Sequence, residues 1–180
     1  MSKLKIGDKA IDFILPAVDG ENYSLKMFDD KKAVAVIFVC NHCPYVLAWE
    51  KRLIELQNKF TDKGVSFALI CSNDSQKYPD DGFEKMKTHA FQKNYPFPYL
   101  RDESQEVARK YGALKTPEIF LFDADRKLCY HGAPDDNYED ADLVEQNYFR
   151  DALLAILEGK PVPIPETPPL GCTIKWKPVI

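Results

Sequence analysis

The most hydrophobic segment of the chain is an unbroken apolar run at residues 33–39. A run without polar alternation predicts a strand that is covered on both faces. Apolar residues then recur at three- and four-residue steps until Gly64, which predicts an amphipathic helix. These residues are Val46, Trp49, Leu53, Leu56 and Phe60. A second apolar run at 65–71 predicts another buried strand, so residues 33–71 read as a β-α-β unit.

Three more helices and two hairpins are predicted around this unit. The turn signal Asp19-Gly20, with segments 10–16 and 23–25 on either side, predicts an N-terminal hairpin. The segments 118–123 and 127–131 predict an antiparallel hairpin with a short turn. Helices are expected near 83–93, 103–111 and 142–158, and the last of these should bury Leu143, Phe149, Leu153, Leu154 and Leu157.

The C-terminal segment differs from the rest in composition. Residues 161–180 hold six of the thirteen prolines, so they cannot form a helix or an inner strand. The pattern shows no internal repeat and no linker between domains. We therefore expect one α/β domain over 1–160, with the helix near 83–93 as an insertion and the tail 161–180 packed on the same domain.

Charge and hydropathy narrow the classes of partner. The 180 residues include 24 Lys and Arg against 28 Asp and Glu, a net charge of −4, so no basic surface for nucleic acid or anionic membrane is expected. No apolar run is long enough to cross a membrane, and residues 1–8 lack the apolar core of a signal peptide. A cytoplasmic location is the resulting expectation.

The cysteines carry the strongest chemical signal. There are five, at positions 40, 43, 71, 129 and 172, and an odd number with one close pair does not indicate a secreted disulfide framework. Cys40 and Cys43 form a Cys-x-x-Cys motif where the buried strand meets the predicted helix. Such a pair indicates redox chemistry or metal binding.

The position of the pair predicts different roles for its two thiols. On a first helical turn, residues three apart share a face and can close a small disulfide ring. The positive helix start should lower the pKa of Cys40, which makes it the exposed nucleophile. Cys43, one turn further in, should be shielded and act as the resolving thiol. His42 lies between them and either stabilises the thiolate or simply faces solvent.

The motif 38–44, followed later by Lys115-Thr116-Pro117, a hairpin and a helix, resembles the thioredoxin superfamily. The segment 7–13 and the inserted helix are similar to its redoxin branch, which comprises oxidoreductases of the TlpA/ResA type and peroxiredoxins. The tail segment 171–177 resembles that of redoxin-domain proteins of unassigned activity.

This resemblance implies a thioredoxin-like fold, with a central mixed sheet flanked by helices, and thiol–disulfide exchange. It also implies a cis Thr116-Pro117 bond beside the cysteines, where substrate backbone docks. The expected partners are a disulfide-containing protein or small molecule and an external thiol reductant or reductase. The chain itself needs no cofactor and no metal for this chemistry. Val34 stands where thioredoxins carry a buried acid, so Glu118 becomes a candidate for handling the proton of Cys43.

A peroxiredoxin-like peroxidase is the nearest alternative. Peroxiredoxins place a Thr three residues before the reactive Cys and a Pro seven residues before it. The corresponding residues are Ile37 and Ala33 for Cys40, and Cys40 and Val36 for Cys43, so both tests fail. A dithiol can still consume peroxide slowly, which keeps this alternative open.

Copper binding is the alternative from another class. Sco-type copper proteins share the fold, and His131 could join Cys40 and Cys43 as a third ligand for Cu(I). Against it, Sco proteins have Cys-x-x-x-Cys and a membrane anchor. A structural zinc site would need a second pair of ligands close in sequence, which the chain does not offer.

The three remaining cysteines are expected to have different roles. Cys71 and Cys129 fall in strand patterns and should be buried as small hydrophobic residues. Cys172 lies in the tail, where it is either packed or a possible extra redox thiol that pairs with the active-site cysteines or with another chain. Ile174 and Trp176 should hold the tail against the domain.

Overall fold

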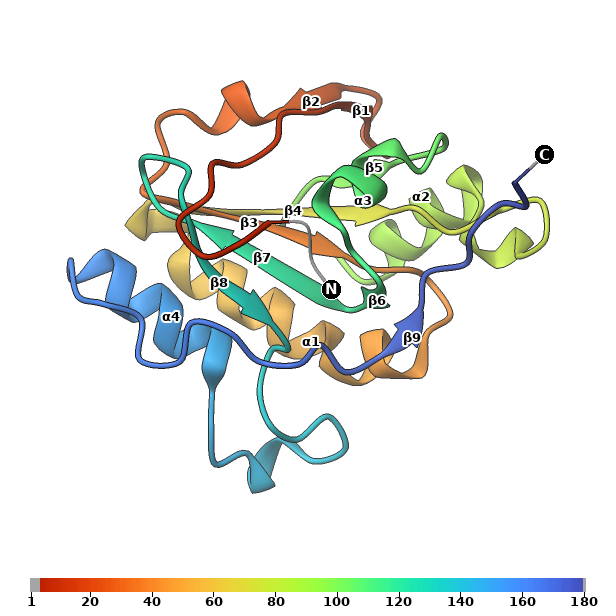
Figure 1. Cartoon of the computed structure of the whole chain (residues 1–180). Coiled ribbons are helices and arrows are strands. Elements are labelled where there is room, and N and C mark those ends of the chain that lie inside the picture. Colours follow the sequence, from red (N-terminus) through yellow and green to blue (C-terminus); the bar gives the residue numbers. More distant parts are fainter. Residues whose placement is uncertain (1–3, 180) are drawn as a thin grey trace.

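A five-stranded mixed sheet forms the centre of the molecule in a computed structural model that describes residues 4–179 (Figure 1). The strand order is β5-β4-β3-β7-β8, with β3, β4 and β5 parallel and β7 and β8 antiparallel to their neighbours. The strands are β3 (Ala33–Phe38), β4 (Val65–Cys71), β5 (Tyr99–Arg101), β7 (Glu118–Phe122) and β8 (Leu128–Gly132). Residues 1–3 and 180, the ends of the expected domain and tail, lie outside the described residues.

The two faces of β3 belong to two hydrophobic cores. Ala33, Ala35 and Ile37 pack on one face, in a core shared with α1, α2 and α4. The alternate residues of β3 pack on the other face, in a core shared with α3 and the N-terminal hairpin. Burial on both faces explains why this strand has no polar alternation. The helices are α1 (Pro44–Phe60), α2 (Phe83–Gln92), α3 (Glu106–Tyr111) and α4 (Tyr148–Leu157).

Most elements predicted from the pattern are confirmed. The β-α-β unit is β3-α1-β4, the inserted helix is α2, and β7 and β8 form the antiparallel hairpin. The N-terminal hairpin consists of β1 (Ile14–Pro16) and β2 (Asn22–Ser24), which are shorter than the predicted segments.

The predicted starts of two helices were wrong. Helix α4 begins at Tyr148 and not at 142, because the carboxylate of Asp136 accepts the N–H groups of Glu145 and Gln146 and holds that segment outside the helix. Leu143 is consequently 64% exposed and not part of the core. Helix α3 begins at Glu106 and not near 103.

The start of α3 is set by a side chain that precedes it. The carboxylate of Asp102 accepts the N–H groups of Val107 and Ala108 at 3.4 and 3.0 Å. Such a contact satisfies amide groups that have no partner within the helix. Strand β5 was not predicted, because its three residues become a strand through their pairing with β4.

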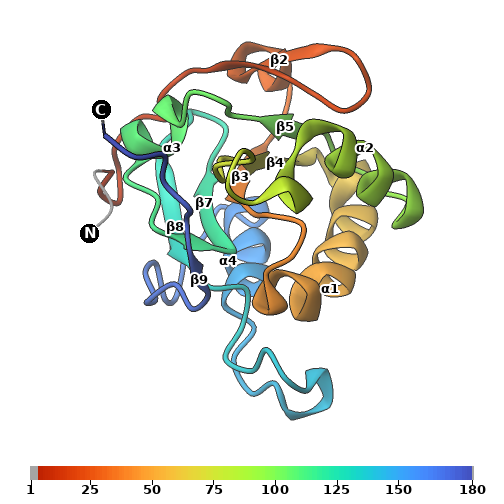
Figure 2. The same ribbon diagram turned by 90° about the vertical axis from the view of Figure 1, so that its right-hand side faces the viewer.

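The C-terminal tail runs back across the molecule, passes the loop that precedes β7 and continues to α3 (Figures 1 and 2). Its strand β9 (Cys172–Thr173) pairs antiparallel with β6 (Lys115–Thr116). Ile174 is 3% exposed, and Trp176 stacks on the guanidinium of Arg109 at 4.5 Å from the ring centre. Both residues therefore hold the tail as predicted.

Helices long and apolar enough to cross a membrane do not occur among residues 4–179.

Candidate active site

The two cysteines of the motif lie at the carboxyl end of β3, on either side of a short loop. Cys43 is the N-cap of α1, and Pro44 occupies the first helical turn. Cys40 precedes the helix, so the prediction that both thiols share the first helical turn was wrong. The prediction of an exposed Cys40 was also wrong, because Cys40 is 1% exposed and Cys43 0%. All five cysteines are thiols.

The surroundings of the pair reverse the predicted order of acidity. Hydrogen bonding from the Cys40 thiol lowers the pKa of Cys43 to about 4, although burial acts in the opposite direction. Contacts with Cys172, the amide of Val46 and Thr116 contribute to the same lowering. For Cys40, the hydrogen bond to Cys43, burial and the nearby charge of Asp81 raise the pKa far above its usual range. The thiolate therefore belongs to the thiol at the helix start.

The loop before β7 covers both sulfurs. The Thr116-Pro117 bond is cis, as the resemblance implied. Sγ of Cys43 lies 3.2 Å from the carbonyl oxygen of Thr116, to which the thiol donates when it is protonated, and Oγ1 of Thr116 lies 3.7 Å from Sγ of Cys40. The structure thus brings together Cys40, Cys43, Thr116 and Pro117, although the first and last are far apart in the sequence.

A buried carboxylate holds the backbone of this loop. Glu118 is 1% exposed, and its Oε2 accepts the N–H groups of Leu114 and Lys115 at 2.7 and 2.8 Å. Its Oε1 lies 2.7 Å from Nε2 of His131. Since both oxygens of Glu118 are engaged in this way, the residue holds the loop, and its expected role as a proton carrier for Cys43 gains no support.

His131 lies with Glu118 and not with the cysteine pair. It is 4% exposed, and its Nδ1 is 3.4 Å from the carboxylate of Glu166. Among residues 4–179, the one group of three potential ligands with donor atoms within 4.8 Å of one another is Cys40, His42 and Asp81. The copper ligand set of Cys40, Cys43 and His131 is therefore not assembled.

Asp81 is a site residue that the sequence did not reveal. It is fully buried in the 3-10 turn η3 (Pro79–Asp81), and its Oδ1 accepts the N–H of Asn41 at 2.8 Å. Its Oδ2 accepts Nδ2 of Asn73 at 2.8 Å. Nδ1 of His42 lies 2.8 Å from the same Oδ2 without making a hydrogen bond to it. Asp81 thereby anchors the loop between the cysteines, and nothing in its polar sequence neighbourhood distinguishes it.

Solvent reaches the cysteine loop from the side of α2. A hollow of about 410 Å³ adjoins the loop at Asn41 and His42, and its other wall includes Asp80, Lys85 and His89. The side chain of Asn41 is held by the carbonyl of Asp80 and the hydroxyl of Tyr99, each at 2.8 Å. The wall of this hollow is thus polar and partly basic.

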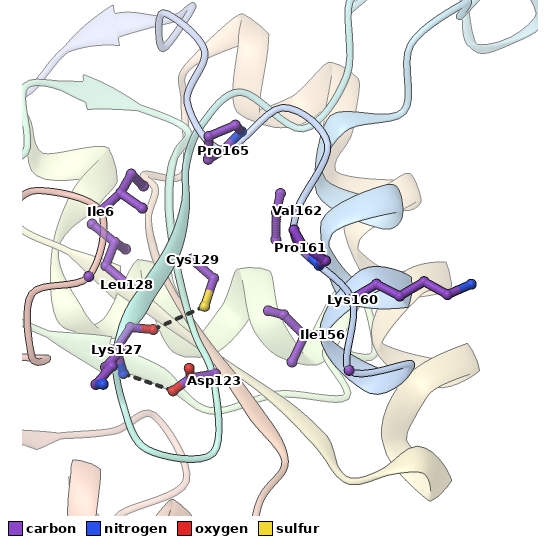
Figure 3. A pocket seen from close by; sticks show the side chains of 12 residues that line it. Ile6, Asp123, Lys127, Leu128, Cys129, Ile156, Lys160, Pro161, Val162 and Pro165 are labelled. Carbon is purple, nitrogen blue, oxygen red and sulfur yellow. Dashed lines mark hydrogen bonds between the residues drawn. The ribbon is translucent and has the colours of Figure 1, made fainter.

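Another pocket, of about 510 Å³, lies at the opposite end of the sheet, where β7 ends and β8 begins (Figure 3). Cys129 lines it and is half-buried, so the prediction of a fully buried Cys129 was wrong. The prediction for Cys71 is confirmed, because Cys71 is 0% exposed. Cys129 lies away from the site around Cys43, whereas Sγ of Cys71 lies 3.9 Å from the carbonyl oxygen of Asp81.

Comparisons with known proteins agree with this geometry. A model of the AhpC/TSA family matches residues 6–131. A thiol-disulfide oxidoreductase, ResA, from Bacillus thuringiensis is 25% identical over 128 residues, which cover 70% of this chain and 68% of that protein.

Solved structures extend the comparison to the tail. An uncharacterized conserved protein from Geobacillus kaustophilus is 43% identical, with a TM-score of 0.93 over 99% of this chain and 96% of the other. The thioredoxin domain of a thiol-disulfide oxidoreductase from Bacteroides vulgatus is 21% identical and covers 72% and 89% of the two chains with a TM-score of 0.62, which is a likeness of fold. The similarity to a protein named as a thiol-disulfide oxidoreductase supports an oxidoreductase role at a coarse level. The central mixed sheet is thioredoxin-like, and the chain belongs to the AhpC/TSA family.

Proposed function

We propose that this protein is a thiol–disulfide oxidoreductase in which Cys40 and Cys43 form the redox pair. The observation that carries the proposal is the unequal pair itself. Two hydrogen-bonded thiols lie at the start of α1, beside the Thr116-Pro117 bond, and one of them is strongly stabilised as a thiolate. A thiolate is the species that attacks a disulfide.

The lowered pKa of Cys43 favours this thiol for the first attack. Its thiolate attacks one sulfur of a substrate disulfide, a Cys43–substrate bond forms, and the other substrate sulfur leaves as a thiolate and takes up a proton. Cys40 then gives up its proton and attacks Sγ of Cys43, which forms the Cys40–Cys43 disulfide and releases the second substrate thiol. Two electrons and the proton of Cys40 pass from the protein to the substrate, the second substrate thiol takes its proton from solvent, and an external thiol reductant restores the pair.

Access to the pair limits what reacts with it. Both sulfurs are buried, and the hollow beside Asn41 and His42 is the open side of the loop. A disulfide of a small molecule, or one on a protruding protein segment, fits such an approach. His42 stands at this entrance, close to Cys40 and Asp81, so we assign it a tuning role in the exchange.

Serine variants test the pair and its order. Reduction of a small aromatic disulfide, with an external dithiol as reductant, should fall about 100-fold or more in Cys43→Ser, since the attacking thiolate is gone. Cys40→Ser should still be oxidised at Cys43 by the substrate disulfide, and mass spectrometry detects the disulfide that Cys43 then carries. Cys129→Ser is the matched control and should behave like the unaltered protein. Full activity in Cys43→Ser would refute the proposal.

Thiol peroxidase activity is a second candidate, supported by the family match and by the low pKa of Cys43. The Cys43 thiolate would attack a peroxide oxygen and become a sulfenic acid as water or an alcohol leaves. Cys40 would then form the disulfide and release water. Against a peroxide specialist, the third residue before Cys43 is Cys40 and not a threonine. Peroxide consumption faster than disulfide reduction, at equal concentrations of both, would make this the main activity.

A further inference from the structure

The tail lies on the edge at which the resemblance places a substrate. Strand β9 pairs with β6 so that Cys172 faces Thr116, and the N–H of Ile174 donates to the carbonyl of Leu114 at 3.0 Å. A Cβ on Gly171 would lie 2.0 Å from the carbonyl oxygen of Thr116 and 3.2 Å from the nitrogen of Pro117. The chain thus approaches the cis bond closely enough to require glycine, and its own tail covers this edge.

This pairing brings a third thiol to the redox pair. Thr116 contacts Cys43 through its carbonyl oxygen, at 3.2 Å from Sγ, and faces Cys172 across the β6–β9 pair. Cys172 also packs against the hydrophobic core that contains both cysteines of the motif. The Cys172 thiol also lies near enough to Cys43 to contribute to the lowering of the Cys43 pKa. Cys43 therefore has one thiol on the loop side, Cys40, and one on the tail side.

We propose that Cys172 is a third redox thiol, which converts the Cys40–Cys43 disulfide into a Cys43–Cys172 disulfide; this inference rests on the proposed function. The sulfur of Cys172 attacks Sγ of Cys43. The bond between these two sulfurs forms while the Cys40–Cys43 bond breaks, and Cys40 keeps the electron pair and takes up the proton that Cys172 loses. The exchange needs no external oxidant, because the number of disulfides does not change.

The charges around Cys172 favour this step after the site has been oxidised. Burial, the hydrogen bond to Cys43 and the negative charge of Cys43 raise the pKa of Cys172 to about 11 in the reduced protein. The Cys43 anion disappears when Cys43 enters a disulfide. Lys115 and Lys175, which act in the opposite direction, then favour the Cys172 thiolate. The product ties β9 to the start of α1 and closes the edge at Thr116.

Oxidised glutathione can test this inference on the full chain. One equivalent is added to the reduced protein, remaining thiols are alkylated in acid, and disulfide-linked peptides are identified by mass spectrometry. We expect a Cys43–Cys172 peptide in the unaltered protein and in Cys129→Ser, and more of it in Cys40→Ser, where Cys172 alone can displace glutathione from Cys43. Cys172→Ser should contain only the Cys40–Cys43 disulfide.

The outcomes separate this inference from the function on which it rests. If Cys40→Ser accumulates glutathione on Cys43 and no Cys43–Cys172 peptide, Cys172 is not a redox thiol, while the proposed oxidoreductase activity stands. If neither Cys40 nor Cys43 becomes oxidised in the unaltered protein, the proposed function itself fails. The double variant Cys40→Ser/Cys172→Ser should stop at the glutathione mixed disulfide, and a Cys43 that loses glutathione there would also overturn the role of Cys172.

Discussion

Cysteine side chains of identical chemistry acquire different acidities in this site through their neighbours. Cys43 caps a helix and receives hydrogen bonds from other thiols, whereas Cys40 lies near the carboxylate of Asp81. Cys172 lies near the positive charges of Lys115 and Lys175 and also near the Cys43 anion. Of the three neighbouring sulfurs, therefore, only that of Cys43 is an anion, because a second negative charge nearby would be disfavoured.

The pH dependence of the thiolate follows from these shifts. With a pKa of about 4 against an ordinary value near 9, Cys43 remains a thiolate from neutral pH down to about pH 5 and is protonated below pH 4. The ultraviolet absorbance of the thiolate should show this midpoint in the unaltered protein and lose it in Cys43→Ser. Cys172→Ala should move the midpoint upward, since the thiol that helps to stabilise the anion is removed. A midpoint near the ordinary value in the unaltered protein would contradict the described surroundings of Cys43.

At the scale of elements, the site depends on three segments that meet at the end of β3. The loop after β3 supplies the thiols, the turn η3 anchors that loop through Asp81, and β6 places Thr116 over the sulfurs. Strand β9 adds the tail to the outer edge of β6. The close approach of Gly171 to Thr116 controls this last pairing.

Gly171→Ala should displace β9 while all thiols remain. The added Cβ would lie 2.0 Å from a backbone oxygen, so the tail must move away from Thr116. We expect a several-fold lower yield of the Cys43–Cys172 disulfide and a correspondingly higher yield of the Cys40–Cys43 disulfide, both measured by the peptide mapping described above. Thr173→Ala is the control, since Thr173 is exposed on the same strand. Equal yields in both variants would show that the pairing does not present Cys172 to Cys43.

At the scale of the whole molecule, the tail and the loop before β7 are held by one buried polar network. Glu118 binds two amide groups of the loop and contacts His131 on β8. The backbone of His131 in turn pairs with the tail, because its N–H donates to the carbonyl of Pro165 and its carbonyl accepts the N–H of Thr167, each at 3.0 Å. The network therefore joins the sheet, the loop and the tail, and we expect it to contribute to the stability of the fold.

Glu118→Gln should destabilise the protein by about 1–3 kcal/mol, because a buried carboxylate that satisfies several donors loses its charge and an acceptor. Urea unfolding followed by circular dichroism measures this change. Glu166→Gln is the matched control, since its carboxylate is 65% exposed and lies 3.4 Å from His131, so its effect should stay within about 0.5 kcal/mol. Similar midpoints for Glu118→Gln and the unaltered protein would mean that the network adds no stability.

The accuracy of the sequence-based predictions depended on the range of the interactions that form each element. The strand β3, the helix α1 and the β7–β8 hairpin were predicted because their patterns repeat over neighbouring residues. The start of α4 was missed, because a side chain from outside the helix, Asp136, holds the preceding segment. Strand β9 was missed as well, since two residues form a strand only against a partner.

The sequence by itself determined the chemistry available to this protein: a cysteine pair between a buried strand and a helix, with a Thr-Pro dipeptide before a hairpin. The order of acidity within the pair, the anchoring role of Asp81 and the placement of Cys172 beside Cys43 were decided by the tertiary structure alone. The physical reason is that a thiol's pKa and its partners depend on charges and hydrogen bonds across space. Local sequence spacing does not record which distant carboxylate or thiol the fold brings within reach.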